Sequence, residues 1–505
     1  SIIGLRKPQK MANDNSLSIA STTNRQGLDS SLSEFSEQLS KACEVVINRF
    51  KGLDEAKAYS GFSPATVESW FDENLPSKGM DFDELMALIQ SKVIDTATMN
   101  MGPYMYAYVM TGGNQISIIA ELLATTINQN VGKWHLAPSI SELEKRVVNW
   151  GAEFVGYPST AGGVLVSGGS AANLTSLTVA RNLFLEKENV RQKGLFGMPT
   201  LRMYASSEVH GCVDKSAESL GIGSNNLQKV STNDDFTINT SELIERIEAD
   251  ITAGFRPFCI VGNAGTVNTG AIDDLDKLAE IAQKYQMWFH VDGAYGGLAA
   301  AVYDRKPLFK GMEKADSLAL DFHKWLYQPF EGGCALIKNW NTLHKSFYTE
   351  ASYLSSDKQN DGRLDFNEYG FQLSRNAKSL KIYMTFKAYG ADRLRKVIAE
   401  DIENTRYLAS IVEKASDFRL SSKVVLGIVC FQFLGKNDGT DTEYVNDLNR
   451  RIIPALERDG RMFIAGTTLK GKSVIRACLI NHRQQHKHLA RLLEVIREVG
   501  NGLEV

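Results

Sequence analysis

Between Gly162 and about Asn339, short apolar runs alternate with stretches of helical periodicity, and this pattern constrains the fold more than any other feature of the chain. The runs are Gly163–Val166, Leu201–Tyr204, Phe258–Val261, Trp288–Val291, Ser317–Leu320 and Cys334–Ile337. Runs this short suit strands that are buried on both faces, and strands that alternate with helices build βαβ units. We therefore predict an α/β fold with a mostly parallel sheet that is covered by helices.

The regions on either side have other patterns. Before Gly156, apolar residues repeat at spacings of three and four, which predicts helices. These helices are Phe35–Phe50, Phe82–Ile94, Ile116–Ile127 and Ser141–Phe154. After a polar loop at about 349–365, the periodicity returns at Ala377–Tyr389 and His486–Val499, with a strand-like run at Val424–Leu434. We predict a flexible tail at 1–30, an N-terminal helical segment at 31–156, a large α/β domain at 157–390 and a small C-terminal α+β domain at 391–505.

Composition narrows the class of protein. The chain has 505 residues, 43% of them hydrophobic, which is enough for more than one core. Its net charge is −3, from 56 basic and 59 acidic side chains, so no basic excess favours nucleic acid or an anionic membrane as a partner. No apolar run reaches the roughly 18 residues of a membrane span, and the first residues lack the apolar core of a secretory signal. We therefore expect a cytoplasmic protein.

The six cysteines are scattered and form no CxxC pair. They are Cys43, Cys212, Cys259, Cys334, Cys430 and Cys478. Several lie in the apolar runs, so we expect buried, reduced thiols rather than a disulfide framework. The spacing that a tetrahedral zinc site usually shows is also missing, and we expect no metal.

A glycine-rich turn, Ser167-Gly168-Gly169-Ser170, leaves the first predicted strand and enters a helix. Such a turn exposes backbone N–H groups at the positive end of the helix dipole, and a serine hydroxyl adds a donor, so it can hold a phosphate group. Turns of this kind also cap helices without any ligand, so the motif alone is weak.

Two further motifs follow later strands. Asp292 directly follows the strand-like run Trp288–Val291, within His290-Val291-Asp292-Gly293-Ala294-Tyr295, and Lys324 ends the run Asp321-Phe322-His323-Lys324. A lysine amine can bond an aldehyde cofactor, and a carboxylate can keep a pyridine nitrogen protonated. Because open parallel sheets collect ligands at the carboxyl ends of their strands, both side chains point to one crevice. Together they predict a pyridoxal phosphate enzyme, although Asp before Gly is also common in turns.

Two weaker signals agree with this interpretation. His210 begins a helix after the strand at Leu201–Tyr204, and its imidazole can stack on a cofactor ring. Thr266 follows the strand at Phe258–Val261 and can bond a cofactor oxygen. Taken alone, each residue is better explained by an ordinary helix start or turn.

These motifs together resemble the group II amino-acid decarboxylases of fold type I, a family that includes aromatic-amino-acid, glutamate, histidine and diaminobutyrate enzymes. The resemblance runs from about Leu32 to Gly500, and its most specific parts are His290–Tyr295 and Asp321–Lys324. It implies a large domain with a mostly parallel seven-stranded sheet, a small C-terminal domain and pyridoxal 5'-phosphate as cofactor. It also implies a homodimer with the active site at the interface.

The resemblance assigns roles by position. Lys324 would carry the cofactor as a Schiff base, Asp292 would meet the pyridine nitrogen, and His210 would stack on one ring face with Ala294 against the other. Gly169, Ser170, Asp321 and His323 match positions near the cofactor phosphate, and Thr266 matches a pocket threonine. Arg476 matches an arginine that meets the substrate carboxylate in some members, a task that suits its planar fork, although an ion pair between domains is the ordinary alternative.

Tyr353 lies in the polar loop and matches a tyrosine that protonates the carbanion left when carbon dioxide departs. Relatives that make aldehydes tend to have phenylalanine at this position. We therefore predict that Tyr353 is catalytic and that the chain releases an amine. Without the family match, an exposed aromatic residue in a loop would be the better explanation.

The substrate is less well defined. Tyr108 favours an aromatic or otherwise bulky amino acid, whereas Thr111 and Gly112 look more like the branch that acts on acidic amino acids. We predict decarboxylation of an L-amino acid to its amine. The alternatives are glutamate, aspartate, cysteine sulfinate or diaminobutyrate as substrate, an aldehyde synthase or another fold type I reaction. A catalytically silent homologue is disfavoured because Lys324 and Asp292 are intact.

Overall fold

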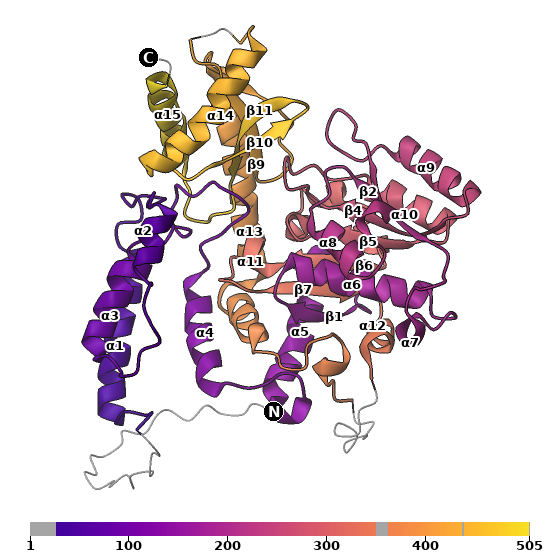
Figure 1. The fold of residues 1–505 in the computed structure, drawn as a ribbon, viewed down its shortest axis with the longest axis horizontal. Coiled ribbons are helices and arrows are strands. Elements are labelled where there is room, and N and C mark those ends of the chain that lie inside the picture. Colours follow the sequence, from indigo (N-terminus) through magenta and orange to yellow (C-terminus); the bar gives the residue numbers. More distant parts are fainter. Residues whose placement is uncertain (1–26, 350–361, 437–438, 504–505) are drawn as a thin grey trace. The chain divides into compact units, whose positions relative to one another are not determined.

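The computed structural model describes residues 27–349, 362–436 and 439–503 (Figure 1). The described residues form two compact units. One consists of the residues up to Gly52 together with Trp70–Thr96, and the other consists of Leu53–Ser69 and the residues from Ala97 onward. The domain ranges expected from the sequence remain predictions. None of the described helices is long and apolar enough to cross a membrane.

The smaller unit is helical. It contains α1 (Leu32–Phe50), α3 (Phe82–Ile89) and the π-helical turn η1 (Gln90–Ile94), which confirms the two helices predicted there. Ser31 and Asp81 cap the starts of α1 and α3 with their side chains, as polar residues at helix N-termini do. None of the residues in these three elements is buried.

The larger unit contains a seven-stranded sheet in the order β1-β7-β6-β5-β4-β2-β3 (Figure 1). Its strands are β1 (Gly162–Val166), β2 (Leu201–Ser206), β3 (Leu227–Val230), β4 (Arg256–Asn263), β5 (Trp288–Asp292), β6 (Ser317–Asp321) and β7 (Gly333–Ile337). All neighbouring strands are parallel except β7, which runs antiparallel to both β1 and β6. The predicted α/β fold with a mostly parallel, helix-covered sheet is confirmed.

Each face of this sheet has its own helices because side chains alternate along the strands. On β4, Cys259 and Val261 belong to a buried apolar cluster that includes Leu177 and Val213. Ile260 belongs to a second cluster, which includes Val148 and Leu278. The helices of the first face are α6 (Gly169–Phe184), α8 (Cys212–Ser219) and α12 (Trp340–Phe347); those of the second are α5 (Pro138–Val155), α9 (Thr240–Thr252) and α10 (Leu275–Lys284). The sheet is therefore covered on both faces.

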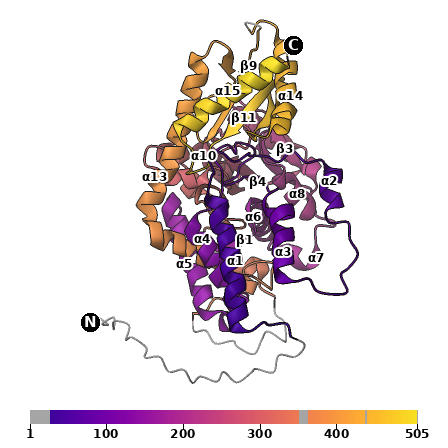
Figure 2. The ribbon, with the colours of Figure 1, turned by 90° about the vertical axis from the view of Figure 1, so that its left-hand side faces the viewer.

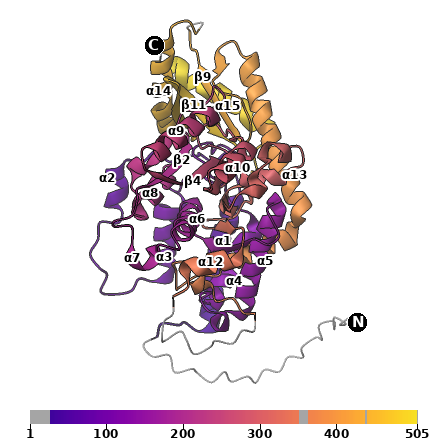
Figure 3. The ribbon, with the colours of Figure 1, turned by 90° about the vertical axis from the view of Figure 1, so that its right-hand side faces the viewer.

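Helix α13 (Lys378–Lys414) connects this layer structure to the C-terminal part of the chain. It packs against α4 (Gln115–Ile127) and α5, and then against the C-terminal sheet, as Figures 2 and 3 show. The helix is broken at Gly390, whose φ of 74° is a left-handed conformation that favours glycine.

The C-terminal sheet has four antiparallel strands in the order β10-β11-β9-β8. They are β8 (Phe418–Leu420), β9 (Ile428–Phe433), β10 (Ala465–Leu469) and β11 (Lys472–Cys478). Helices α14 (Thr442–Asp459) and α15 (His486–Gly502) pack on it (Figure 2). The predicted small α+β region is confirmed, although β8, β10 and β11 were not predicted.

Candidate active site

A cavity of about 620 Å³ opens at the carboxyl ends of the central strands. Asn263 at the end of β4 is paired in register with Asp292 at the end of β5, and β6 ends beside them at Asp321. All three side chains line the cavity. This is the edge at which open α/β sheets bind their ligands.

Lys324 enters the cavity from α11 (Phe322–Trp325), a single helical turn directly after β6. Its Nζ lies 3.0 Å from Oδ2 of Asp321. The next residue, Trp325, is fully buried and stacks on the ring of Tyr295, with the ring centroids 5.3 Å apart. The amine is therefore carried by a turn that the core holds firmly.

Asp292 is buried at the end of β5, and its Oδ1 accepts a hydrogen bond from the N–H of Ala294. Burial raises the pKa of its carboxyl, while the Ala294 N–H and the nearby charge of Lys324 act in the opposite direction. A cationic group brought into the cavity would further favour the ionised carboxylate. This environment suits a partner for a protonated ring nitrogen.

The predicted phosphate turn reaches the same cavity through Gly169 and Ser170, at the start of α6. A Cβ atom on Gly169 would lie 2.7 Å from Cβ of Ala294 and 3.0 Å from Oδ2 of Asp321, so glycine allows the turn to approach both residues this closely. The other carboxylate oxygen of Asp321, Oδ1, is buried and has no hydrogen-bond partner within the described residues. A buried polar atom without a partner is a feature of a site built for a ligand.

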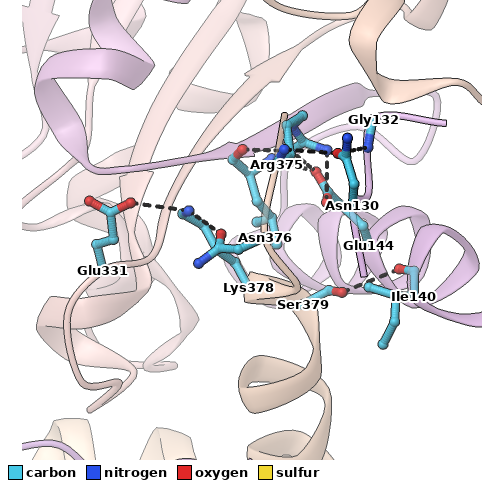
Figure 4. Close-up of polar contacts among 10 residues, drawn as sticks. Asn130, Gly132, Ile140, Glu144, Glu331, Arg375, Asn376, Lys378 and Ser379 are labelled. Carbon is cyan, nitrogen blue, oxygen red and sulfur yellow. Dashed lines mark hydrogen bonds and ion pairs between the residues drawn. The ribbon is translucent and has the colours of Figure 1, made fainter. Parts of the chain in front are cut away.

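A buried ion pair fixes the strand that leads into this turn. Arg375 pairs with Glu144 (Figure 4). Arg375 also donates to the carbonyl of Leu165 at 2.7 Å, and Glu144 accepts from the N–H of Leu165 at 3.0 Å. Leu165 lies on β1, an edge strand of the sheet, so these side chains satisfy its outward-facing backbone groups. Lys378 lies three residues after Arg375, and its Nζ lies 3.1 Å from Glu331 on the cavity wall.

Ala294 and two histidines also line the cavity. His210 is exposed, and its Nδ1 accepts from the N–H of Cys212. His323 is buried, and its Nδ1 accepts from the N–H of Gly332 at 3.1 Å. Its proton therefore lies on Nε2, which faces Asp321. Burial lowers the pKa of the His323 imidazole.

Thr266 lines the cavity and is almost fully buried, with its hydroxyl bonded to that of Thr269. Tyr108 also lines it, with 63% of its surface exposed. Thr111, by contrast, is buried but is not among the residues around the cavity. Tyr353 lies outside the described residues, so its position stays a prediction.

Arg476 lies in the wall of the cavity, where its guanidinium donates to backbone carbonyls. Nε donates to the carbonyl of Val267 and Nη1 to that of Tyr108, both at 2.9 Å, and Nη2 also donates to Val267. Nη1 and Nη2 each carry a second N–H group that these bonds do not use. Its predicted contact with a substrate carboxylate stays a prediction.

Several cavity residues were not predicted as site residues. Among them are the polar, thiol and loop residues Asn173, Cys212, Asn263, Asn268, Phe330 and Glu331. Asn263 could have been predicted, because it is a polar residue at the end of an apolar strand, as Asp292 is. Its amide is held by the buried Asp273, which accepts from both nitrogens of Asn263. Phe330 and Glu331 lie in a loop after Lys324 that has no recognisable motif.

Comparison with known proteins agrees with this geometry. The model of the pyridoxal-dependent decarboxylase conserved domain matches residues 64–434. An aromatic-L-amino-acid decarboxylase of Bacillus atrophaeus is 30% identical over 466 residues, which cover 92% of this chain and 95% of that protein. The chain belongs to the pyridoxal-dependent decarboxylase family.

Solved structures of such enzymes have the same fold. A tryptophan decarboxylase of Catharanthus roseus in complex with L-tryptophan is 26% identical, with a TM-score of 0.85 over 94% of this chain and 100% of that one. An Oryza sativa TDC with PLP and tryptamine is 23% identical, with a TM-score of 0.89 over 95% of this chain and 100% of that one. The chain is thus a pyridoxal-phosphate-dependent carboxy-lyase that acts on an amino acid, and it has the fold type I architecture.

Proposed function

We propose that this decarboxylase converts an aromatic or otherwise bulky L-amino acid to its amine and carbon dioxide in the cavity around Lys324. The observation that carries the proposal is that Lys324, Asp292 and the Gly169–Ser170 turn all line one cavity. The exposed ring of Tyr108 in the cavity wall, and the similarity to an aromatic-L-amino-acid decarboxylase, support an aromatic side chain as the substrate's distinguishing group.

In this proposal the cofactor is held at both ends. Lys324 bonds its aldehyde, Asp292 pairs with its ring nitrogen, and His210 and Ala294 lie against the two ring faces. The phosphate group is held by Gly169 and Ser170 with Asp321 and His323 nearby, and Thr266 completes the pocket. Backbone N–H groups at the start of α6 favour an anion there.

When bound, pyridoxal phosphate accepts the electron pair that is left as carbon dioxide departs. The protein's task is to orient the substrate and to place protons. The carboxylate of Asp292 keeps a proton on the ring nitrogen, which is worth most in a buried site. The Tyr353 hydroxyl donates a proton to the substrate's Cα, and Arg476 offers its remaining N–H groups to the substrate carboxylate.

A screen of carbon dioxide release tests the substrate class. We expect release from aromatic L-amino acids to exceed that from glutamate, aspartate, cysteine sulfinate and diaminobutyrate by about tenfold or more in kcat/KM, which corresponds to about 1.4 kcal/mol of selective binding in the transition state. Lys324→Ala should abolish release, while Lys338→Ala, a distant exposed lysine, should not change it. Preference for an acidic or diamino substrate would contradict the proposal.

Product analysis tests Tyr353. We expect Tyr353→Phe to reduce amine formation at least about a hundredfold, because general acid catalysis usually contributes that much. The residual product should shift toward aldehyde with ammonia and hydrogen peroxide, since the unprotonated carbon is then exposed to oxygen. Tyr348→Phe, in the same region of the chain, serves as the control. If Tyr353→Phe still produced amine at the wild-type rate, Tyr353 would not be the proton donor.

We further propose a homodimer. Helix α4 presents a stripe of exposed apolar side chains at helical spacing, consisting of Ile119, Leu122, Leu123 and Ile127. Contiguous exposed apolar surface of this kind is typical of an interface. Light scattering should give twice the chain mass, and Leu122→Glu with Leu123→Glu should halve it. Ile251→Glu, at an isolated exposed apolar residue, should leave the mass unchanged, and a monomeric wild type would contradict the proposal.

A cytoplasmic location is also proposed. It is supported by Cys212, Cys259, Cys334, Cys430 and Cys478, which are buried and unpaired, as is usual in a reducing compartment. Recovery of the protein outside the cytoplasmic fraction of the source cells would contradict it.

A further inference from the structure

A short hydrogen bond joins strand β5, which carries Asp292, to helix α6, which begins with the Gly169–Ser170 turn. Nε2 of His290 lies 2.6 Å from Oδ1 of Asn173, and both side chains are fully buried. His290 is on β5, two residues before Asp292, so both side chains point to the same face of the sheet. Asn173 is on α6, one helical turn after Gly169. The bond therefore ties the strand of the carboxylate to the helix of the phosphate turn.

The surrounding donors determine where the protons lie in this network. The Trp288 indole can only donate, and its Nε1 donates to Oγ of Ser317 at 2.8 Å. The Ser317 hydroxyl then donates to Nδ1 of His290, also at 2.8 Å, which leaves the imidazole proton on Nε2. That proton is donated to Oδ1 of Asn173, whose amide N–H groups face Sγ of Cys212 at 3.4 Å.

The reverse orientation is less favourable. With the proton on Nδ1 of His290, Ser317 would accept two hydrogen bonds, and its own hydroxyl proton would have no other acceptor among the described residues. A buried O–H without an acceptor is costly. The Nε2–H form satisfies every member of the network, and the chain runs in one direction from Trp288 to Cys212 on the cavity wall.

We propose that His290 and Asn173 are positioning residues that fix the separation between Asp292 and the Gly169–Ser170 turn, and so set how tightly both ends of the cofactor are held. The proposal rests on the roles given above to these anchors. A rigid cofactor must meet both at once, so a bond that holds their supports together lowers the cost of binding.

The chemistry of the pair fits this role better than a role in stability alone. The neighbouring Phe289 and Val291 on β5 face the opposite side and pack with apolar residues. An apolar residue in place of His290 would also fill the space, without the cost of burying a polar ring. Burial lowers the pKa of His290 to about 3, so the imidazole stays neutral and the bond persists throughout the working pH range.

The dissociation constant of pyridoxal phosphate tests the proposal. We expect His290→Phe and Asn173→Leu each to raise it about tenfold, because the cofactor must then itself order the two anchors that this bond no longer holds together. The double variant should cost no more than about the larger single effect, because both changes break the same bond. Asn449→Leu is the matched control, because Asn449 is equally buried and bonded to the backbone of Phe433 in the C-terminal sheet.

Thermal stability and cofactor affinity together distinguish a positioning role from a role in stability alone. If all three single variants lower thermal stability but only His290→Phe and Asn173→Leu weaken cofactor binding, the positioning role is supported. Unchanged binding in either of these two variants would overturn it. A wild type that binds no pyridoxal phosphate would instead contradict the proposed function itself.

Nitrogen NMR of the wild-type protein with labelled histidine gives a test that requires no folded variant. The signal of His290 should show the Nε2–H tautomer in the cofactor-free protein, unchanged from about pH 6 to pH 8. An Nδ1–H tautomer, or a protonated ring at pH 7, would overturn the assigned direction and with it the tie to Asn173.

Discussion

The burial of charged groups at the ends of β5 and β6 is the constraint on which the rest of this structure depends. Asp292 is 8% exposed and Asp321 is 1% exposed, and an isolated carboxylate in such a place is strongly disfavoured. The Lys324 amine pairs with Asp321, and the Ala294 N–H bonds Asp292. A cofactor that carries a cationic ring nitrogen and an anionic phosphate would complete this arrangement of charges.

A layer of buried polar contacts surrounds these groups and keeps them in place. The segment after Lys324 is held by Asn114, which donates to the Tyr327 carbonyl, and by Thr385, which accepts from Gln328. The strand before the phosphate turn is held by the Arg375–Glu144 pair. Removing one partner of such a buried pair typically costs about 3–5 kcal/mol, because the other charge is left uncompensated. The cavity is thus rigid on several sides, as orienting a substrate requires.

Six of the seven strands of the large sheet could be predicted from the sequence, because they are short apolar runs. Lys324 and Asp292 could be expected in one cavity because they follow two of these runs directly. Strand β3 was missed because Gln228 and Lys229 interrupt it where it lies at the sheet edge. Strands β10 and β11 were missed because Thr, Gly, Lys and Ser dominate their exposed ends. The His290–Asn173 bond joins residues 117 positions apart, and no local pattern indicates such a contact.

Chemical trapping of the cofactor tests the central claim most directly. Borohydride reduces the bond between a lysine amine and the aldehyde of pyridoxal phosphate to a stable secondary amine, which peptide mass spectrometry can locate. The account predicts that one lysine per chain gains the mass of the reduced cofactor, and that this lysine is Lys324. Attachment at another lysine, or no attachment to protein saturated with pyridoxal phosphate, would contradict it.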